Sequence, residues 1–180
     1  MIVTTANDKG LDVSLVSDKL EDITTFMTCR IISFDGKELW KTQLPATFKA
    51  NTATKLTIDL KPANLTASDK KKCLIVVSVD SKALDCEQSI EYFNHPKDLD
   101  FPKPIITRKI EKKGSTYSIT LTTDKLAKTV FIEIPGEGFL SDNYFDMLPG
   151  ETKTVEVSNS DVEIKDTELK IKTIVDSFLN

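Results

Sequence analysis

Residues 116–135 read TYSITLTTDKLAKTVFIEIP, and this stretch decides the fold. In its first half, apolar side chains occupy every second position from Tyr117 to Leu121, with hydroxyl side chains between them. In its second half, Val130, Ile132 and Ile134 repeat the period of two. Successive side chains of a β-strand point to opposite faces of the sheet. The stretch therefore predicts two strands, each with one face in a core and one in water.

The same period recurs along the chain, together with the β-branched residues and threonines that suit a pleated, half-buried surface. Turn signals separate the strands, and Asp35-Gly36 is typical of a tight hairpin. A short helical turn is expected only within Ala63–Lys70. We expect six strands before residue 95 and five after it: Asp12–Val16, Thr24–Phe34, Glu38–Phe48, Lys55–Leu60, Lys72–Val79 and Cys86–Phe93, then Ile106–Glu111, Thr116–Thr122, Thr129–Pro135, Thr152–Ser158 and Thr167–Asp176. Short strands at this spacing predict β-sandwiches, and there are too many for one seven-stranded domain.

A boundary between two domains is expected from His95 to Pro104, a segment that contains three prolines. Proline cannot donate a ladder hydrogen bond and restricts its neighbour to extended conformations, so this segment predicts a stiff linker. The sequence therefore predicts an all-β protein of two tandem immunoglobulin-like sandwich domains joined by a proline-rich linker. The expected domains cover 1–95 and 105–180, with the linker at 96–104.

The net charge and the hydropathy of the chain argue against two classes of partner, nucleic acids and membranes. The net charge is −4 and the basic residues are scattered, so the basic stripe of a nucleic-acid-binding protein is absent from the sequence. No apolar stretch approaches the roughly 20 residues that a membrane-spanning helix needs. The N-terminus lacks the basic and apolar regions of a signal peptide. We therefore expect neither nucleic acid nor membrane as a partner, and the compartment stays open, an exported bacterial parent being one alternative.

Residues with catalytic or metal-binding chemistry form no recognisable pattern. The three cysteines, Cys29, Cys73 and Cys86, have no metal-ligand spacing and are expected to be buried thiols, with a disulfide as the alternative in an exported protein. His95 is the only histidine and has no nucleophile or carboxylate at a catalytic spacing. The glycines of residues 135–139 lack the pattern of a phosphate-binding loop. We expect no catalytic residues, no metal and no cofactor.

Aromatic and polar side chains supply the remaining candidates. Trp40 follows the predicted hairpin, where a core or interface role is favoured over a platform for sugar stacking. In the loop of residues 138–151, Asp and Asn side chains can bond to nearby backbone and order the loop, which is favoured over contact with a ligand. The candidates for interdomain or sugar contact are Trp40, Tyr92, Asp142, Asn143 and Tyr144.

That loop carries a resemblance to a known family. The run SDNYFDMLPGE at 141–151, followed by the strand KTVEV at 153–157, resembles the C-terminal immunoglobulin-like domain of β-mannosidases, in which leucine usually stands at the position of Met147. Residues 92–104, YFNHPKDLDFPKP, resemble the joint between the last two domains of that family. FDGKELW at 34–40, with Val16-Ser17-Asp18 before it, resembles the penultimate domain. The matches run in family order from about residue 11 to 176.

The resemblance implies an origin in an exo-acting, retaining hydrolase of terminal non-reducing β-D-mannose, within the β-galactosidase-like glycoside hydrolases. Its catalytic glutamates would lie on a (β/α)₈ barrel that this chain does not contain, so no catalytic residue carries over. The expected function is accessory: the two sandwiches brace the catalytic barrel, their main partner, and a mannose-containing glycan is a further candidate partner. The alternatives are a carbohydrate-binding module and a cell-surface adhesive domain pair.

Overall fold

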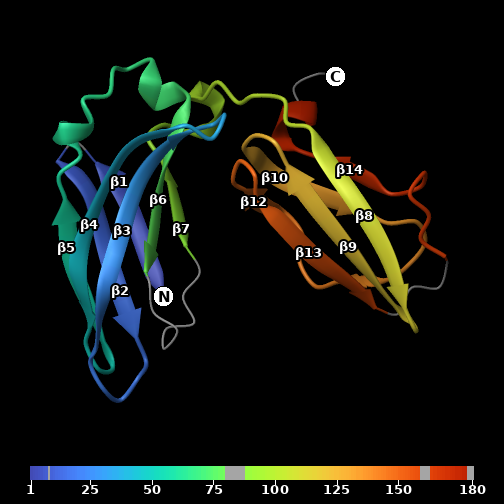
Figure 1. The fold of residues 1–180 in the computed structure, drawn as a ribbon, viewed down its shortest axis with the longest axis horizontal. Coiled ribbons are helices and arrows are strands. Elements are labelled where there is room, and N and C mark those ends of the chain that lie inside the picture. The colour runs from blue at the N-terminus through green and yellow to red at the C-terminus, as the bar shows by residue number, and fades with distance from the viewer. Residues whose placement is uncertain (8, 80–87, 159–162, 178–180) are drawn as a thin grey trace. The chain divides into compact units, whose positions relative to one another are not determined.

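The computed structural model describes residues 1–7, 9–79, 88–158 and 163–177. The chain divides into two compact units. The first comprises residues 1–33 and 37–100, and the second comprises residues 101–180 together with the turn Phe34–Gly36. Among the described residues the regular elements are β-strands and short 3₁₀ helices, with no α-helix (Figure 1).

The first unit is a sandwich of two antiparallel sheets, drawn from blue to green in Figure 1. One sheet has the order β1-β2-β5, formed by Ile2–Asn7, Gly10–Ser17 and Thr52–Ile58. The other has the order β4-β3-β6-β7, formed by Glu38–Phe48, Ile23–Ser33, Cys73–Val79 and Ser89–Tyr92. The chain passes between the sheets after β2, β4 and β5, which is the crossing pattern of an immunoglobulin-like sandwich.

Alternation along the strands builds the core of the first unit. On β2, Leu11, Val13 and Leu15 are buried while the residue between the first two, Asp12, is exposed. On β6 the alternation fails, because every residue from Cys73 to Val77 is fully buried. Such a continuous apolar run is typical of a strand covered on both faces. The core comprises Ile2, Leu11, Val13, Leu15, Met27, Cys29, Ile31, Ala46, Phe48, Ile58, Cys73, Ile75 and Val77.

The second unit also consists of two antiparallel sheets, drawn from yellow to red in Figure 1. The four-stranded sheet has the order β11-β13-β9-β8, formed by Phe139–Leu140, Thr152–Ser158, Thr116–Thr123 and Ile106–Lys113. The three-stranded sheet has the order β12-β10-β14, formed by Phe145–Met147, Ala127–Glu133 and Lys170–Lys172. Its core comprises Tyr117, Ile119, Leu121, Ala127, Val130, Ile132, Met147, Val155, Val157, Ile164 and Leu169.

These sheets confirm the predicted all-β fold of tandem immunoglobulin-like sandwiches. The predicted hairpin at Asp35-Gly36 joins β3 to β4, and Gly36 takes a φ of 91° that only glycine adopts readily. The single helical turn expected within Ala63–Lys70 was misplaced: two 3₁₀ turns, η1 at Lys61–Ala63 and η2 at Asp69–Lys71, overlap only the ends of that range. Two further 3₁₀ turns are η3 at Pro96–Asp98 and η4 at Ile174–Ser177.

Several predicted boundaries were wrong. The strand expected over Thr167–Asp176 is only β14, because the chain turns into η4 directly after it. The strand expected over Cys86–Phe93 is observed as β7, and residues 86 and 87 lie outside the described part of the chain. Strands β1, β11 and β12 were not predicted. The latter two have only two and three residues, too few to display a period.

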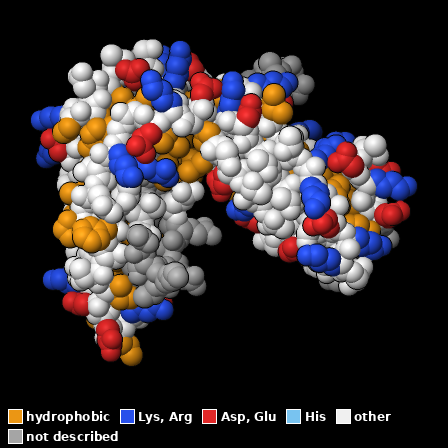
Figure 2. All heavy atoms as spheres, viewed as in Figure 1, with side chains coloured by type: hydrophobic (Ala, Val, Ile, Leu, Met, Phe, Trp, Pro, Cys, Tyr) orange, Lys and Arg blue, Asp and Glu red, His pale blue; other side chains and the backbone are white. Residues whose placement is uncertain are grey.

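Acidic and basic side chains lie interspersed on the face of each unit that Figure 2 shows. Apolar side chains reach the surface in small areas between them (Figure 2). Among the described residues, no helix has the length and hydropathy required to cross a membrane.

Candidate functional site

Asn143 organises the loop between β11 and β12 of the second unit. Its Oδ1 accepts hydrogen bonds from the backbone N–H of Ile132 at 2.8 Å and of Tyr144 at 3.0 Å. Its Nδ2 donates to the carbonyl oxygen of Ile132 at 3.0 Å. The amide thus satisfies both backbone groups of a residue on β10, as a partner strand would. The loop is thereby fixed against β10.

Asp142 in this loop and Asp146 on β12 are each held by a lysine. The Asp142 carboxylate accepts from the Asn143 N–H at 2.8 Å and pairs with Lys153 at 2.7 Å. Asp146 accepts a hydrogen bond from the backbone N–H of Thr129 at 2.9 Å and forms an ion pair with Lys128 at 2.8 Å. Both side chains of the latter pair are mostly buried. These carboxylates therefore act within the fold, and their hydrogen bonds order the loop.

Tyr144 differs from its neighbours because its side chain is 65% exposed. Its backbone has a φ of 61°, in the left-handed region that is costly for a residue with a large side chain. The ring stacks on Phe131 of β10 with centroids 5.0 Å apart and an angle of 28° between the planes. The loop therefore presents one aromatic ring to solvent on an aromatic support.

The other two aromatic candidates lie in the first unit. Trp40 on β4 is half-buried, packs against the core and pairs with Ile31 of β3. Tyr92 at the end of β7 is also half-buried and pairs with Leu74 of β6. The structure therefore brings Asp142, Asn143 and Tyr144 together in one loop and does not bring Trp40 and Tyr92 together with them.

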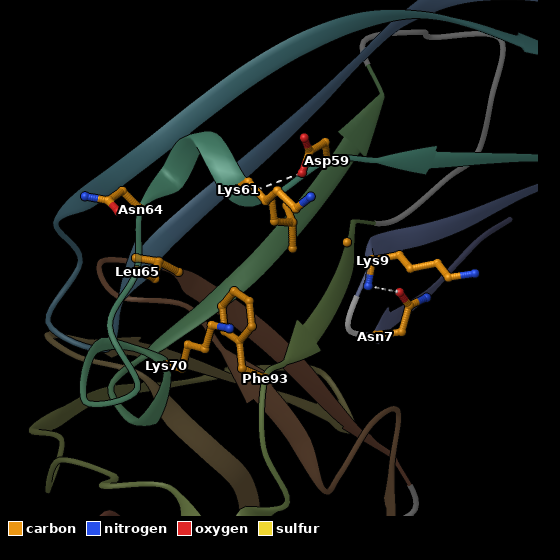
Figure 3. A pocket seen from close by; sticks show the side chains of 10 residues that line it. Asn7, Lys9, Asp59, Lys61, Asn64, Leu65, Lys70 and Phe93 are labelled. Carbon is orange, nitrogen blue, oxygen red and sulfur yellow. Dashed lines mark hydrogen bonds between the residues drawn. The ribbon is translucent and has the colours of Figure 1, made fainter.

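A pocket of about 260 Å³ lies at one end of the first sandwich (Figure 3). Its walls come from the β1–β2 turn, the segment after β5, η2 and the residue after β7. Lysines and apolar side chains line it together, with Phe93 between them. The lining residues are Asn7, Lys9, Gly10, Asp59, Leu60, Lys61, Asn64, Leu65, Lys70 and Phe93.

Each lysine of this pocket has its backbone fixed by a short side-chain motif. Asn7 Oδ1 accepts from the N–H of Lys9 at 2.8 Å, and Asp59 Oδ1 accepts from the N–H of Lys61 at 2.9 Å. Both are turns in which an Asx side chain bonds to the backbone two residues on. Before Lys70, the side chains of Thr66 and Asp69 cap one another's backbone N–H groups. The positions of the lysines on the pocket wall are therefore defined by local sequence.

The side chains with catalytic chemistry are dispersed in the described part of the chain. No three His, Cys, Asp or Glu residues lie together there as metal ligands would. His95 is exposed and borders a second pocket of the first unit, together with Tyr92 and Phe93. Cys29 and Cys73 are buried free thiols, while Cys86 lies outside the described residues. Burial raises the pKa of the Cys29 thiol to about 11, and burial with the nearby Asp69 carboxylate raises the pKa of Cys73 to about 12. Both thiols are therefore protonated and poorly nucleophilic at neutral pH.

Two family models match this chain in tandem. A mannosidase Ig/CBM-like domain matches residues 9–98, half of the chain. The chain belongs to the mannosidase Ig/CBM-like family. A second model, the Ig-fold domain of mannosidases, matches residues 101–177. No curated protein matches the sequence. The predicted resemblance to the two C-terminal immunoglobulin-like domains of a β-mannosidase is thereby confirmed.

Solved structures share the fold of these mannosidase-type domains. A β-D-mannosidase from Dictyoglomus thermophilum matches with a TM-score of 0.75 and 20% identity, over 97% of this chain and 21% of that one. The exo-chitosanase CsxA from Amycolatopsis orientalis matches with a TM-score of 0.55 and 10% identity, over 96% of this chain and 26% of that one. The chain therefore spans about a fifth to a quarter of the length of these glycoside hydrolases.

The pocket of the mannosidase Ig/CBM-like domain was missed by sequence reasoning. In the sequence the lysines of this pocket belong to the scattered basic residues, and Lys9 lies far from Lys61 and Lys70. A signal was present in the pairs Asn7/Lys9 and Asp59/Lys61, each an Asx residue two positions before a lysine. Only the fold brings these turns to the same end of the sandwich.

Proposed function

We propose that this chain is a pair of non-catalytic accessory domains of a β-mannosidase, an enzyme that hydrolyses terminal non-reducing β-D-mannose. The observation that carries the proposal is the tandem match of mannosidase domain models at 9–98 and 101–177. The similarity to part of a β-D-mannosidase over nearly the whole chain supports the same assignment. In the parent, a catalytic barrel supplies the reacting carboxylates, by a retaining mechanism.

Within the parent enzyme, the two domains brace the barrel. The loop of residues 138–151 supports this role, because the side chains of Asn143, Asp142 and Asp146 form hydrogen bonds and ion pairs within the second unit. A rigid loop that offers one supported aromatic ring, Tyr144, is suited to packing against another protein surface. The partner proposed for the chain is therefore the catalytic domain.

Two measurements test the accessory role. The purified chain should show no turnover of 4-nitrophenyl β-D-mannoside, and turnover that persists through further purification would overturn the proposal. In the parent enzyme, Asn143→Ala should lower the temperature at which mannosidase activity is lost and leave kcat and KM at 25 °C unchanged. A matched change at an exposed strand position, Lys109→Ala, should do neither. Equal heat inactivation of both variants would contradict a bracing role.

The alternative of a carbohydrate-binding module is favoured by one observation, the exposed ring of Tyr144. Among the aromatic candidates, Trp40 and Tyr92 are half-buried and offer less surface for stacking. If Tyr144 is a sugar platform, calorimetry with manno-oligosaccharides should give binding that Tyr144→Ala abolishes. The absence of heat at millimolar ligand would dismiss this alternative.

A further inference from the structure

The pocket of the first unit combines an aromatic ring with cationic side chains. Lys70 Nζ lies 5.7 Å from the centroid of the Phe93 ring. Figure 3 shows the Lys70 ammonium group at the face of the Phe93 ring, whereas Lys61, on the segment after β5, and Lys9, on the β1–β2 turn, extend away from that ring. A ligand that reaches the ring would thus meet the ammonium group of Lys70 there, with Lys61 and Lys9 farther from the ring.

The charge of the pocket is opposite to that of the chain. Its described lining has three lysines and one aspartate, a formal charge of +2, whereas the whole chain has −4. No ion pair joins Lys9, Lys61 or Lys70 to a carboxylate of the residues that the structure describes. The one carboxylate of the lining, Asp59, accepts a backbone N–H through Oδ1. Cationic groups in a concave surface attract anions more strongly than isolated surface lysines do.

The pocket also has an apolar wall. Leu60, Leu65 and Phe93 line it and at the same time pack against the core, so their positions are fixed by the sandwich. Its volume of about 260 Å³ lies just below the usual range for small-molecule pockets, roughly 300–1,000 Å³. The fitting ligand is therefore a single ring that carries an anionic group and an apolar face.

We propose that the first unit binds a hexuronate, the carboxylated sugar unit of an acidic glycan, in this pocket. The carboxylate pairs with the ammonium group of Lys70, which moves off the Phe93 ring to meet it, and the C–H face of the sugar ring packs on Phe93 and Leu65. Lys9 and Lys61 add longer-range attraction. This site goes beyond bracing a catalytic domain and does not depend on it, so either proposal can fail alone.

The test is a titration of the ¹⁵N-labelled chain with methyl glucuronide, with methyl glucoside as the neutral control. Glucuronide should shift the amide resonances of Lys61, Lys70 and Phe93 with a Kd of about 1 mM, and glucoside should bind at least about fivefold more weakly, as expected for loss of one weak ionic contact. Raising the salt from 20 to 200 mM should weaken glucuronide binding about threefold. Equal binding of both sugars, or no shift at 50 mM, would overturn the proposal.

Variants separate the site from the charge of the whole chain. The double variant Lys61→Gln/Lys70→Gln should weaken glucuronide binding at least about fivefold, through loss of the Lys70 contact and of the longer-range attraction from Lys61. Lys41→Gln/Lys55→Gln removes the same charge from exposed positions on β4 and β5 and should leave the affinity within about twofold. Equal losses in the two variants would show non-specific attraction and refute the site.

Inorganic phosphate distinguishes a sugar site from a general anion site. Phe93→Leu keeps the lysines and should weaken glucuronide binding about fivefold while phosphate binding stays unchanged. Trp40 fluorescence, which reports on the first unit, checks that this variant is folded. If phosphate binds as tightly as glucuronide and Phe93→Leu changes neither, the sugar assignment is wrong.

Discussion

Replacing Asn143 by alanine should destabilise the second unit without affecting the first. The side chain makes three hydrogen bonds to backbone groups, at 2.8, 3.0 and 3.0 Å, and two of them involve Ile132. Ile132 is 1% exposed, so water cannot easily replace the lost amide, whereas the N–H of the exposed Tyr144 can be hydrated. With about 1–1.5 kcal/mol for each unsatisfied group of Ile132, the expected cost is about 2–3 kcal/mol.

Two further variants provide a comparison for the expected loss of stability. Asn143→Asp keeps the acceptor for the N–H groups but sets a carboxylate oxygen against the Ile132 carbonyl oxygen, so it should cost at least as much as the alanine variant, about 2–3 kcal/mol. Lys109→Ala removes only an exposed ion pair with Glu111, for which about 0.5 kcal/mol or less is expected. The lysine variant should therefore be more stable than both Asn143 variants.

Urea unfolding measures the effect, with one signal for each unit. The only tryptophan, Trp40, lies in the first unit, so its fluorescence follows that unit alone, while far-UV circular dichroism follows both. With a slope near 1–1.5 kcal/mol per molar urea for a small domain, Asn143→Ala should lower the circular dichroism midpoint of the second unit by about 2 M. The fluorescence midpoint should not move. If Asn143→Ala unfolds within about 0.3 M of Lys109→Ala, the amide does not hold the loop as argued.

Three further changes test other parts of the chain. Gly10→Ala should cost the first unit more than about 2 kcal/mol of stability, seen as a lower Trp40 fluorescence midpoint, and leave the second unit unchanged, because a Cβ there would overlap the carbonyl oxygen of Ile58 on β5. An unshifted midpoint would contradict this expectation. The hydrogen bond from Arg108 holds the pKa of Asp166 below its ordinary value. The stabilisation from this ionised carboxylate is therefore present above the unfolded pKa of about 3.9 and is lost as the pH falls through the folded pKa. Arg108→Ala should return the NMR titration of that carboxyl to the ordinary range, and a titration that stays low would rule out this cause. In the variant Cys86→Ser, Cys29 and Cys73 should react with a thiol reagent at pH 8 only after unfolding, because both thiols are buried. Rapid reaction of the folded chain would show that they are accessible.

The sequence predicted the strands in which successive side chains point alternately into the core and into water. The residues from Tyr117 to Leu121 are an example, because their period of two is the consequence of one buried face. Strand β1 was missed because its centre, Thr4-Thr5-Ala6, carries no strong apolar contrast, although it pairs with β2 along its whole length. Its pairing depends on the strand beside it and not on its own pattern.

The polar candidates show a similar limit. The residue types of Asp142 and Asn143 predicted side-chain hydrogen bonds to backbone, since short amide and carboxylate side chains form them readily. That Asn143 bonds to Ile132, across 11 positions of sequence, follows from the packing of the loop against β10. The pocket around Phe93 joins segments that are even farther apart, so local sequence determines each turn but not their meeting.

The buried run at the start of strand β6 has a consequence for the chain before it folds. Residues 74–77, Leu-Ile-Val-Val, form an uncharged apolar run, with three β-branched residues, of the kind that pairs with copies of itself when exposed. Ribosomal synthesis completes this run before its hydrogen-bonding neighbour β7 exists, so one edge is open in the nascent chain. The three lysines at 70–72 precede the run by one residue, Cys73, and like charges brought together by self-pairing would repel. We therefore expect these lysines to limit aggregation of the growing polypeptide.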